Sequence, residues 1–380
     1  MSAQSPATAA TPAKLGFNVA LNGYRGLCAM LIYGFHLGSA HVVARPSGTA
    51  IADAVTYFWT SFAYGVEMFF MISGFVILGS LERHATVGGF LRDRFVRIFS
   101  AWTPSLIVVA AVCIVFQMKA FAGAGPVQEL GIFIGNLFLI PPLIDLPMVN
   151  PASWSLTYEW AFYLTAAAMA LALRRATARR LALALWIAFA ALFIVVYPRA
   201  VFFLVGALVY RYRDWFVEHR RWLRFPAVSF IAFLLLWRGT GIEKAEIDIT
   251  LGTLVANGRW LFMVAAFVAA LHMFASVCFS ADGQSGFLKS RIAQFLGNIS
   301  YSFYLWHALG MAFVKRAVAI YVVPDFGLAA GYVLFAVVSL AIGLAVGWAS
   351  WQLFEVRLAK LMRRWFTPRP TLGGAVHASH

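Results

Sequence analysis

The first apolar stretch of the chain carries two ionisable side chains, Arg25 and His36, with ten residues between them. In an α-helix this separation comes to about 20° past three full turns, so both side chains lie on one face, roughly 16 Å apart along the axis. A bilayer core is about 30 Å thick, so this face would hold a permanent cation near one water boundary and a titratable base near mid-depth. A lone membrane histidine more often bonds to a neighbouring helix. With Arg25 on the same face, His36 is instead a candidate general base for an alcohol.

Two carboxylates follow in later apolar stretches. Glu67 lies near the outer end of its stretch, at a depth where it could orient His36 and stabilise its charged form. Glu159 lies about one turn into a further stretch, and a buried carboxylate at that depth needs a partner. Interfacial solvation is the alternative for Glu67, and structural pairing is the alternative for Glu159. The neighbouring pair Ser73-Gly74 indicates close helix packing alone.

Three arginines, Arg92, Arg94 and Arg97, follow the second apolar stretch. Arg94 and Arg97 are three positions apart and share a face if this segment is helical. Such a cluster can hold the phosphates of a nucleotide-bearing donor. From spacing alone, the positive charge that flanks membrane spans is the simpler explanation.

The segment 297–307 places four hydroxyl side chains and a second histidine in one apolar stretch. These polar groups do not all share one helix face, and interhelical hydrogen bonds account for most of them. The segment 150–160 adds two tryptophans of the kind found at membrane interfaces. The candidate substrate contacts from these two segments are Trp154, Ser155, Tyr304 and His307.

Composition predicts a polytopic membrane protein. Of 380 residues 62% are hydrophobic and only 12% are charged, against about 25% charged in soluble domains. Three cysteines, Cys28, Cys113 and Cys278, show no metal-ligand spacing and imply no disulfide framework. The net charge of +15 could suggest nucleic acid, but the basic residues flank apolar stretches, which indicates topology signals and lipid contacts.

We predict an all-α fold of about ten membrane-spanning helices with both termini cytoplasmic. In this arrangement 21 of the 30 Lys and Arg residues fall on the cytoplasmic side and 8 outside. The segment 130–143 is too short to cross and is expected to be re-entrant or interfacial. The expected units are a disordered tail at 1–17, the membrane domain at 18–358 and a basic tail at 359–380. The expected spans are 20–41, 57–80, 98–118, 154–173, 180–197, 200–211, 225–238, 258–278, 296–320 and 327–354.

Several motifs in this order resemble the membrane acyltransferase-3 family of bacterial O-acyltransferases. The family's first helix carries Arg or Lys, ten residues and then His, as at Arg25 and His36. Asn22 and Glu67 stand where the family usually has Asp, and Arg357 stands where it has Pro. The other matching segments are Gly65–Phe75, Arg94–Ile98, Trp154–Glu159, Ser300–His307 and Phe354–Arg357.

The resemblance implies transfer of an acyl group, most often acetyl, from cytoplasmic acyl-CoA to a hydroxyl of a carbohydrate or glycolipid, in the bacterial inner membrane. It implies His36 as general base or acyl relay, Arg25 as a phosphate or carbonyl contact, and Glu67 or Glu159 as the group that orients His36. Arg92, Arg94 and Arg97 would hold the CoA phosphates. We expect no metal cofactor and no nucleic-acid partner. We expect contacts with membrane lipid. A secondary transporter or flippase is the competing class, since it shares the spans and the buried charges.

Overall fold

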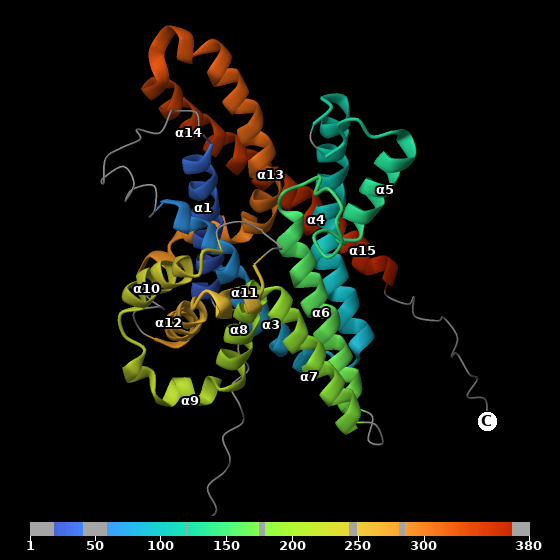
Figure 1. Cartoon of the computed structure of the whole chain (residues 1–380), viewed down its shortest axis with the longest axis vertical. Coiled ribbons are helices and arrows are strands. Elements are labelled where there is room, and N and C mark those ends of the chain that lie inside the picture. Colours follow the sequence, from blue (N-terminus) through green and yellow to red (C-terminus); the bar gives the residue numbers. More distant parts are fainter. Residues whose placement is uncertain are drawn as a thin grey trace, which may run out of the picture.

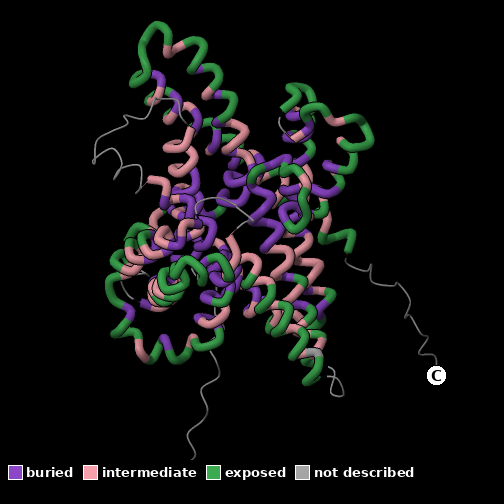
Figure 2. The backbone as a smooth tube through the Cα atoms, viewed as in Figure 1, coloured by how far each residue is buried: buried purple, intermediate pink, exposed green. Residues whose placement is uncertain are grey.

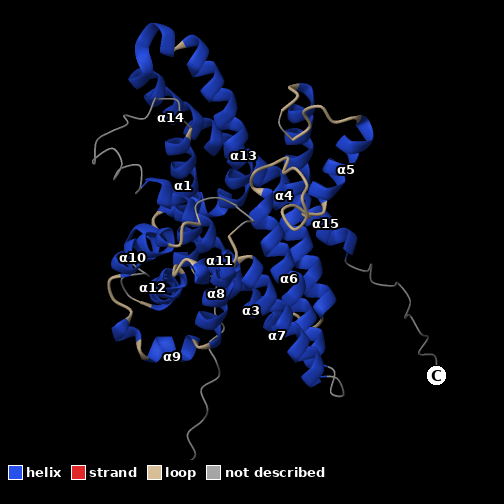
Figure 3. Ribbon diagram, viewed as in Figure 1, coloured by secondary structure: helices blue, strands red, loops and turns tan. Residues whose placement is uncertain are grey.

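The computed structural model describes residues 19–40, 59–118, 120–174, 179–242, 249–280 and 286–366, which form helices joined by turns, with no strand in these ranges (Figure 3). The expected tail at 1–17 lies outside the described residues, as does 367–380. The long helices are α1 (Val19–Ser39), α3 (Gly65–Arg83), α4 (Val87–Val115), α6 (Ser153–Arg174), α7 (Arg179–Val196), α12 (Trp260–Phe279), α13 (Arg291–Tyr321) and α14 (Val323–Ser350) (Figure 1). The shorter ones are α5 (Pro126–Leu137), α8 (Val201–Arg211), α9 (Arg213–Glu218), α10 (Pro226–Gly239), α11 (Leu251–Ala256) and α15 (Ala359–Phe366).

Local sequence signals explain several helix starts. Thr86 Oγ1 accepts from Gly89 N at the start of α4, and Ser290 Oγ accepts from Ala293 N at the start of α13. Pro126 and Pro226 stand at the first positions of α5 and α10, where a missing N–H costs nothing. Helix α4 is continuous through Pro104.

The described part of the chain is that of a multi-pass membrane protein. Six of its helical stretches are long and apolar enough to cross a bilayer: Ser61–Arg83, Val87–Val115, Ser153–Leu173, Arg179–Val196, Trp260–Phe279 and Val323–Phe366. Helices α1 and α13 have the length, 21 and 31 residues, but carry more polar side chains. Each of the ten expected spans coincides with a helix, and α8 and α10 are short, as expected. Helix α5 covers the start of the segment 130–143, and its 12 residues are too few to cross.

Helix α1 lies at the centre of the packing, against α3, α12 and α13. Figure 2 shows buried residues gathered where these helices meet, whereas the far end of the α13–α14 hairpin and the end of α5 are exposed. Glycines permit the close crossings. A Cβ on Gly206 of α8 would overlap the carbonyl oxygen of Met71 of α3, and one on Gly74 would overlap that of Phe203. The packing role expected of Gly74 is therefore confirmed.

A π-helical segment, Trp351–Leu358, joins α14 to α15. The wider turn of a π-helix shifts the direction of its side chains, and such segments are frequent at functional sites. Here the segment carries Glu355, whose side chain is 6% exposed and lies against α13 and α4. The basic segment expected from residue 359 begins as α15, which packs on α4 through the rings of Phe366 and Phe95.

Candidate active site

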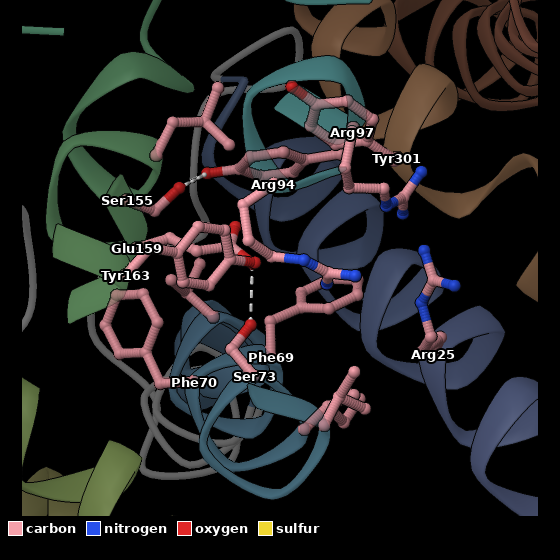
Figure 4. Close-up of a pocket in the computed structure, with 15 residues that line it drawn as sticks. Arg25, Phe69, Phe70, Ser73, Arg94, Arg97, Ser155, Glu159, Tyr163 and Tyr301 are labelled. Carbon is pink, nitrogen blue, oxygen red and sulfur yellow. Dashed lines mark hydrogen bonds between the residues drawn. The ribbon is translucent and has the colours of Figure 1, made fainter. Parts of the chain in front are cut away.

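Two cavities lie along α1, and they share Val66 and Tyr304 in their linings. We call the first the arginine cavity. It has a volume of about 130 Å³ and is lined by Arg25, Arg94, Arg97, Ser73, Glu159, Tyr163 and Tyr301, among others (Figure 4). We call the second the histidine cavity. It has a volume of about 190 Å³, and its lining includes His36, His307, Arg199, Trp154 and Asn150. One helix thus contributes a cation to one cavity and an imidazole to the other.

The arginine cavity holds three cations in different states. Arg25 has no hydrogen-bond or ion-pair partner among the residues that the structure describes. The Arg94 guanidinium lies over the ring of Tyr163, with its carbon 5.9 Å from the ring centroid, and its buried Nε has no hydrogen-bond partner in the described part. Arg97 lies 5.0 Å over the ring of Tyr301 and forms an ion pair with Glu355.

Glu355, from the π-helical segment, forms the ion pair with Arg97. Its Oε1 accepts from Ser302 N at 3.1 Å and from Ser302 Oγ at 2.7 Å, while Oε2 faces Arg97 Nη1. A nearly buried carboxylate with three donors is fixed in place. Arg25 and Arg94 are therefore the cations of this cavity with free capacity for an anion, and Arg97 shares its charge with Glu355.

Glu159 lies on the opposite wall of the arginine cavity. It accepts from Ser73 Oγ at 2.7 Å and from the hydroxyl of Tyr163. Ser73 therefore does more than pack, which corrects the expectation that the pair Ser73-Gly74 serves close approach alone. Figure 4 shows this hydrogen bond beside the guanidinium of Arg94.

The histidine cavity brings two imidazoles together from α1 and α13. The ring centroids of His36 and His307 are 5.2 Å apart. His307 is 2% exposed, and its Nδ1 lies 3.1 Å from the carbonyl oxygen of Phe303 and 2.9 Å from that of Tyr304. Trp154, from the start of α6, also lines this cavity.

Glu67 lies beside Arg199 within the bundle. Its Oε1 is 3.1 Å from Arg199 Nε and accepts from Trp237 Nε1 at 3.0 Å, and the residue is 0% exposed. The Arg199 guanidinium lies 4.8 Å over the ring of Trp154 and lines the histidine cavity. Among the described residues Glu67 has no hydrogen bond to His36, and its ion-pair partner Arg199 is the residue that lines the histidine cavity.

The boundary between the cavities is formed by Tyr304 and Val66. Tyr304 Oη lies 2.8 Å from Ser155 Oγ, and its ring lies 6.2 Å from that of Phe69. Tyr304 and Val66 therefore mark the place where the two cavities adjoin. Within the described residues no three His, Cys, Asp or Glu side chains gather as metal ligands would, and the three cysteines are free and buried.

Comparison with known proteins decides the family, since the model described as "Acyltransferase domain" matches residues 18–351. The chain belongs to the acyltransferase-3 family. It is 25% identical over 323 residues to Acyltransferase MdmB of Streptomyces mycarofaciens, covering 78% of this chain and 79% of that protein. No solved structure matches significantly. The predicted family is confirmed, and with it acyl transfer as the class of reaction.

Within this acyltransferase the predicted site residues divide into groups. Arg25, Arg94, Arg97 and Glu159 share the arginine cavity, and His36, His307 and Trp154 share the histidine cavity. Tyr304 lines both cavities, while Ser155 lines only the arginine cavity and bonds to Tyr304. Arg92 lies elsewhere, and its Nη1 donates to the carbonyl oxygen of Phe366 at 3.1 Å.

Two charged residues at or beside these cavities, Glu355 and Arg199, were not among the predicted ones. Glu355 had a signal, since it lies in a segment that resembles a family motif. Arg199 had none beyond its place in a short connection between two apolar stretches, where charge flanking a span is the ordinary reading. Its burial at 5% exposure and its pairing with Glu67 come from chain segments more than 130 residues apart.

Proposed function

We propose that this acyltransferase transfers an acyl group, most simply acetyl, from cytoplasmic acyl-CoA to a hydroxyl of a carbohydrate acceptor such as an exopolysaccharide, an O-antigen or a lipid-linked glycan. The bacterial inner membrane is its place of action. The observation that carries the proposal is the pair of cavities along α1, one lined by arginines and one by histidines, with a shared boundary at Val66 and Tyr304.

The donor's phosphates bind at the arginine cavity. Arg25 and Arg94 have free capacity for an anion, and guanidinium groups suit phosphate because they donate two parallel hydrogen bonds. Arg97 contributes less to phosphate binding, because its charge is partly neutralised by Glu355. Arg92 lies outside the cavity and acts on the approaching nucleotide through long-range attraction.

The thioester reaches the histidine cavity past Tyr304. Arg25 and His36 are eleven helix steps apart, roughly 16 Å along the axis, a length that an extended phosphopantetheine arm can span. His36 then acts as general base on the acceptor hydroxyl or as a relay that accepts the acyl group. Arg199 and Trp154 provide a charged and an aromatic surface for the acceptor, held in place by Glu67.

The test uses protein purified in nanodiscs with acetyl-CoA, with release of free CoA followed against His36→Ala and Arg25→Ala. Binding is measured separately by thermal shift. We expect the His36 variant to bind acetyl-CoA without turnover and the Arg25 variant to bind it poorly. His219→Ala is the matched control, because His219 lies away from both cavities, against Trp215. If neither acetyl-CoA nor longer acyl-CoAs bind or turn over, the donor assignment is wrong and a transporter or flippase becomes the better explanation.

A further inference from the structure

The hydrogen bonds of His307 determine its tautomer. Both groups near Nδ1 are backbone carbonyl oxygens, of Phe303 and Tyr304, and a carbonyl can only accept. Nδ1 must therefore carry the hydrogen. In the neutral ring the lone pair then lies on Nε2, the nitrogen that takes up a proton.

His307 Nε2 is also buried and without a hydrogen-bond partner among the described residues. Buried polar atoms nearly always have a hydrogen-bond partner, so a buried nitrogen without one in a cavity lining is a candidate contact for a ligand. The cavity it belongs to is the histidine cavity, which His36 lines as well. The ring of His307 is stacked on that of Phe303 at 5.4 Å, which holds its orientation.

His36 differs from His307 in each of these respects. It is half-buried, and in the described part its only ring neighbours are Phe35 and His307, with no hydrogen bond to set its tautomer. An imidazole whose nitrogens make no hydrogen bond is suited to attack as a nucleophile and to carry an acyl group. An imidazole with one nitrogen in a hydrogen bond and the other without one is suited to accept a proton.

We propose that His307 is the general base for the acceptor hydroxyl and that His36 is the acyl relay, an assignment that rests on the proposed function. In the first half-reaction a ring nitrogen of His36 attacks the thioester carbon and the C–S bond breaks. Coenzyme A leaves as the thiol, taking the proton that His36 loses.

In the second half-reaction the acceptor hydroxyl gives its proton to His307 Nε2 while its oxygen attacks the acyl carbon. The C–N bond breaks, and the proton passes from His307 to the ring nitrogen of His36. The sum is thioester plus alcohol to ester plus thiol, and both imidazoles return to their neutral state. The centroid separation of 5.2 Å lets a hydroxyl held at Nε2 meet an acyl group on the other ring.

The experiment separates the two half-reactions in His307→Asn. The asparagine amide can still donate to the two carbonyls but has no basic nitrogen. Protein in octyl glucoside, whose sugar hydroxyls serve as acceptor together with water, is mixed with radiolabelled acetyl-CoA. We expect His307→Asn to release about one equivalent of CoA and to retain the label on the protein. Its steady-state turnover should fall about 100-fold or more, while His36→Ala gives neither release nor label.

Other results would overturn the assignment. Turnover of His307→Asn within threefold of wild type would remove the base role. If His307→Asn still binds acetyl-CoA but neither releases the single equivalent of CoA nor retains the label, the assignment of separate roles to the two histidines is wrong. Absence of CoA release from the wild-type protein would instead mean that the proposed function has failed. His307→Gln provides a second variant if the first does not fold, and His219→Asn should behave as wild type in every measurement.

Discussion

Tyr304 Oη lies 2.8 Å from Ser155 Oγ, and this hydrogen bond joins α13 to α6 at the boundary between the two cavities. Neither residue carries charge, and neither can transfer an acyl group in the scheme above. In the proposed reaction the donor passes this pair on its way from the arginines to the histidines, and the ring of Phe69 lies 6.2 Å from that of Tyr304.

A larger side chain at position 304 should block acyl transfer while leaving donor binding intact. We expect Tyr304→Trp to bind CoA with unchanged affinity and to lose about 100-fold in kcat, the scale on which misplacing reacting groups acts. Tyr304→Phe keeps the ring and loses only the hydrogen bond, so its kcat should stay within about tenfold of wild type. Calorimetric binding of CoA together with steady-state release measures both. Equal loss of binding and turnover in Tyr304→Trp would contradict a path at this boundary.

The arginines offer a comparison between neighbours on one helix. Arg94 lines the arginine cavity, whereas Arg92 donates to Phe366 outside it. Since a hydrogen bond to a charged group contributes about 1.5–3 kcal/mol, Arg94→Ala should weaken CoA binding by about 10- to 100-fold. Arg92→Ala removes the same charge outside the cavity, where only long-range attraction is lost, and should change the Kd by less than about threefold. Similar losses in both variants would show that only general positive charge is needed.

The buried pair Glu67 and Arg199 should matter to stability as well as to activity. Removing one member leaves an uncompensated buried charge, which costs about 3–5 kcal/mol. Glu67→Gln should therefore lower Tm clearly in a thermal-shift measurement. Glu82→Gln is the control, because Glu82 is 59% exposed and its ion pair with Arg213, at 4.0 Å, contributes about 0–1 kcal/mol, while the glutamine oxygen can still accept from the Tyr210 hydroxyl. An unchanged Tm in Glu67→Gln would mean that the pair carries no net stabilisation.

The crossing of α3 and α8 depends on its glycines. A methyl group on Gly206 would overlap the Met71 carbonyl oxygen, so Gly206→Ala should destabilise the protein by roughly 1–3 kcal/mol. Gly88, near the start of α4, has open space around its Cβ position. Gly88→Ala should leave Tm unchanged or slightly raised. A Tm for Gly206→Ala equal to wild type would show that the two helices can separate without cost.

Much of this protein can be predicted from its sequence because the decisive signals are local. Apolar runs of helical length predict the helices, and the separation of Arg25 and His36 follows from the geometry of one helix. The order of short motifs along the chain identified the family. Each of the ten expected spans coincides with a helix. Six of the described helical stretches are both long enough and apolar enough to cross a bilayer.

The partners of the charged groups are decided by tertiary structure. Glu67 is paired with Arg199, Glu159 with Ser73 and Tyr163, and Arg97 with Glu355. Apart from Glu159 and Tyr163, which are four residues apart on α6, these pairings join helices or turns that are adjacent only after the bundle has packed. In an apolar medium a charge takes whichever partner the packing places nearest. Spacing along one helix therefore predicts that a residue faces the interior, while the assembled helices determine which group it meets there.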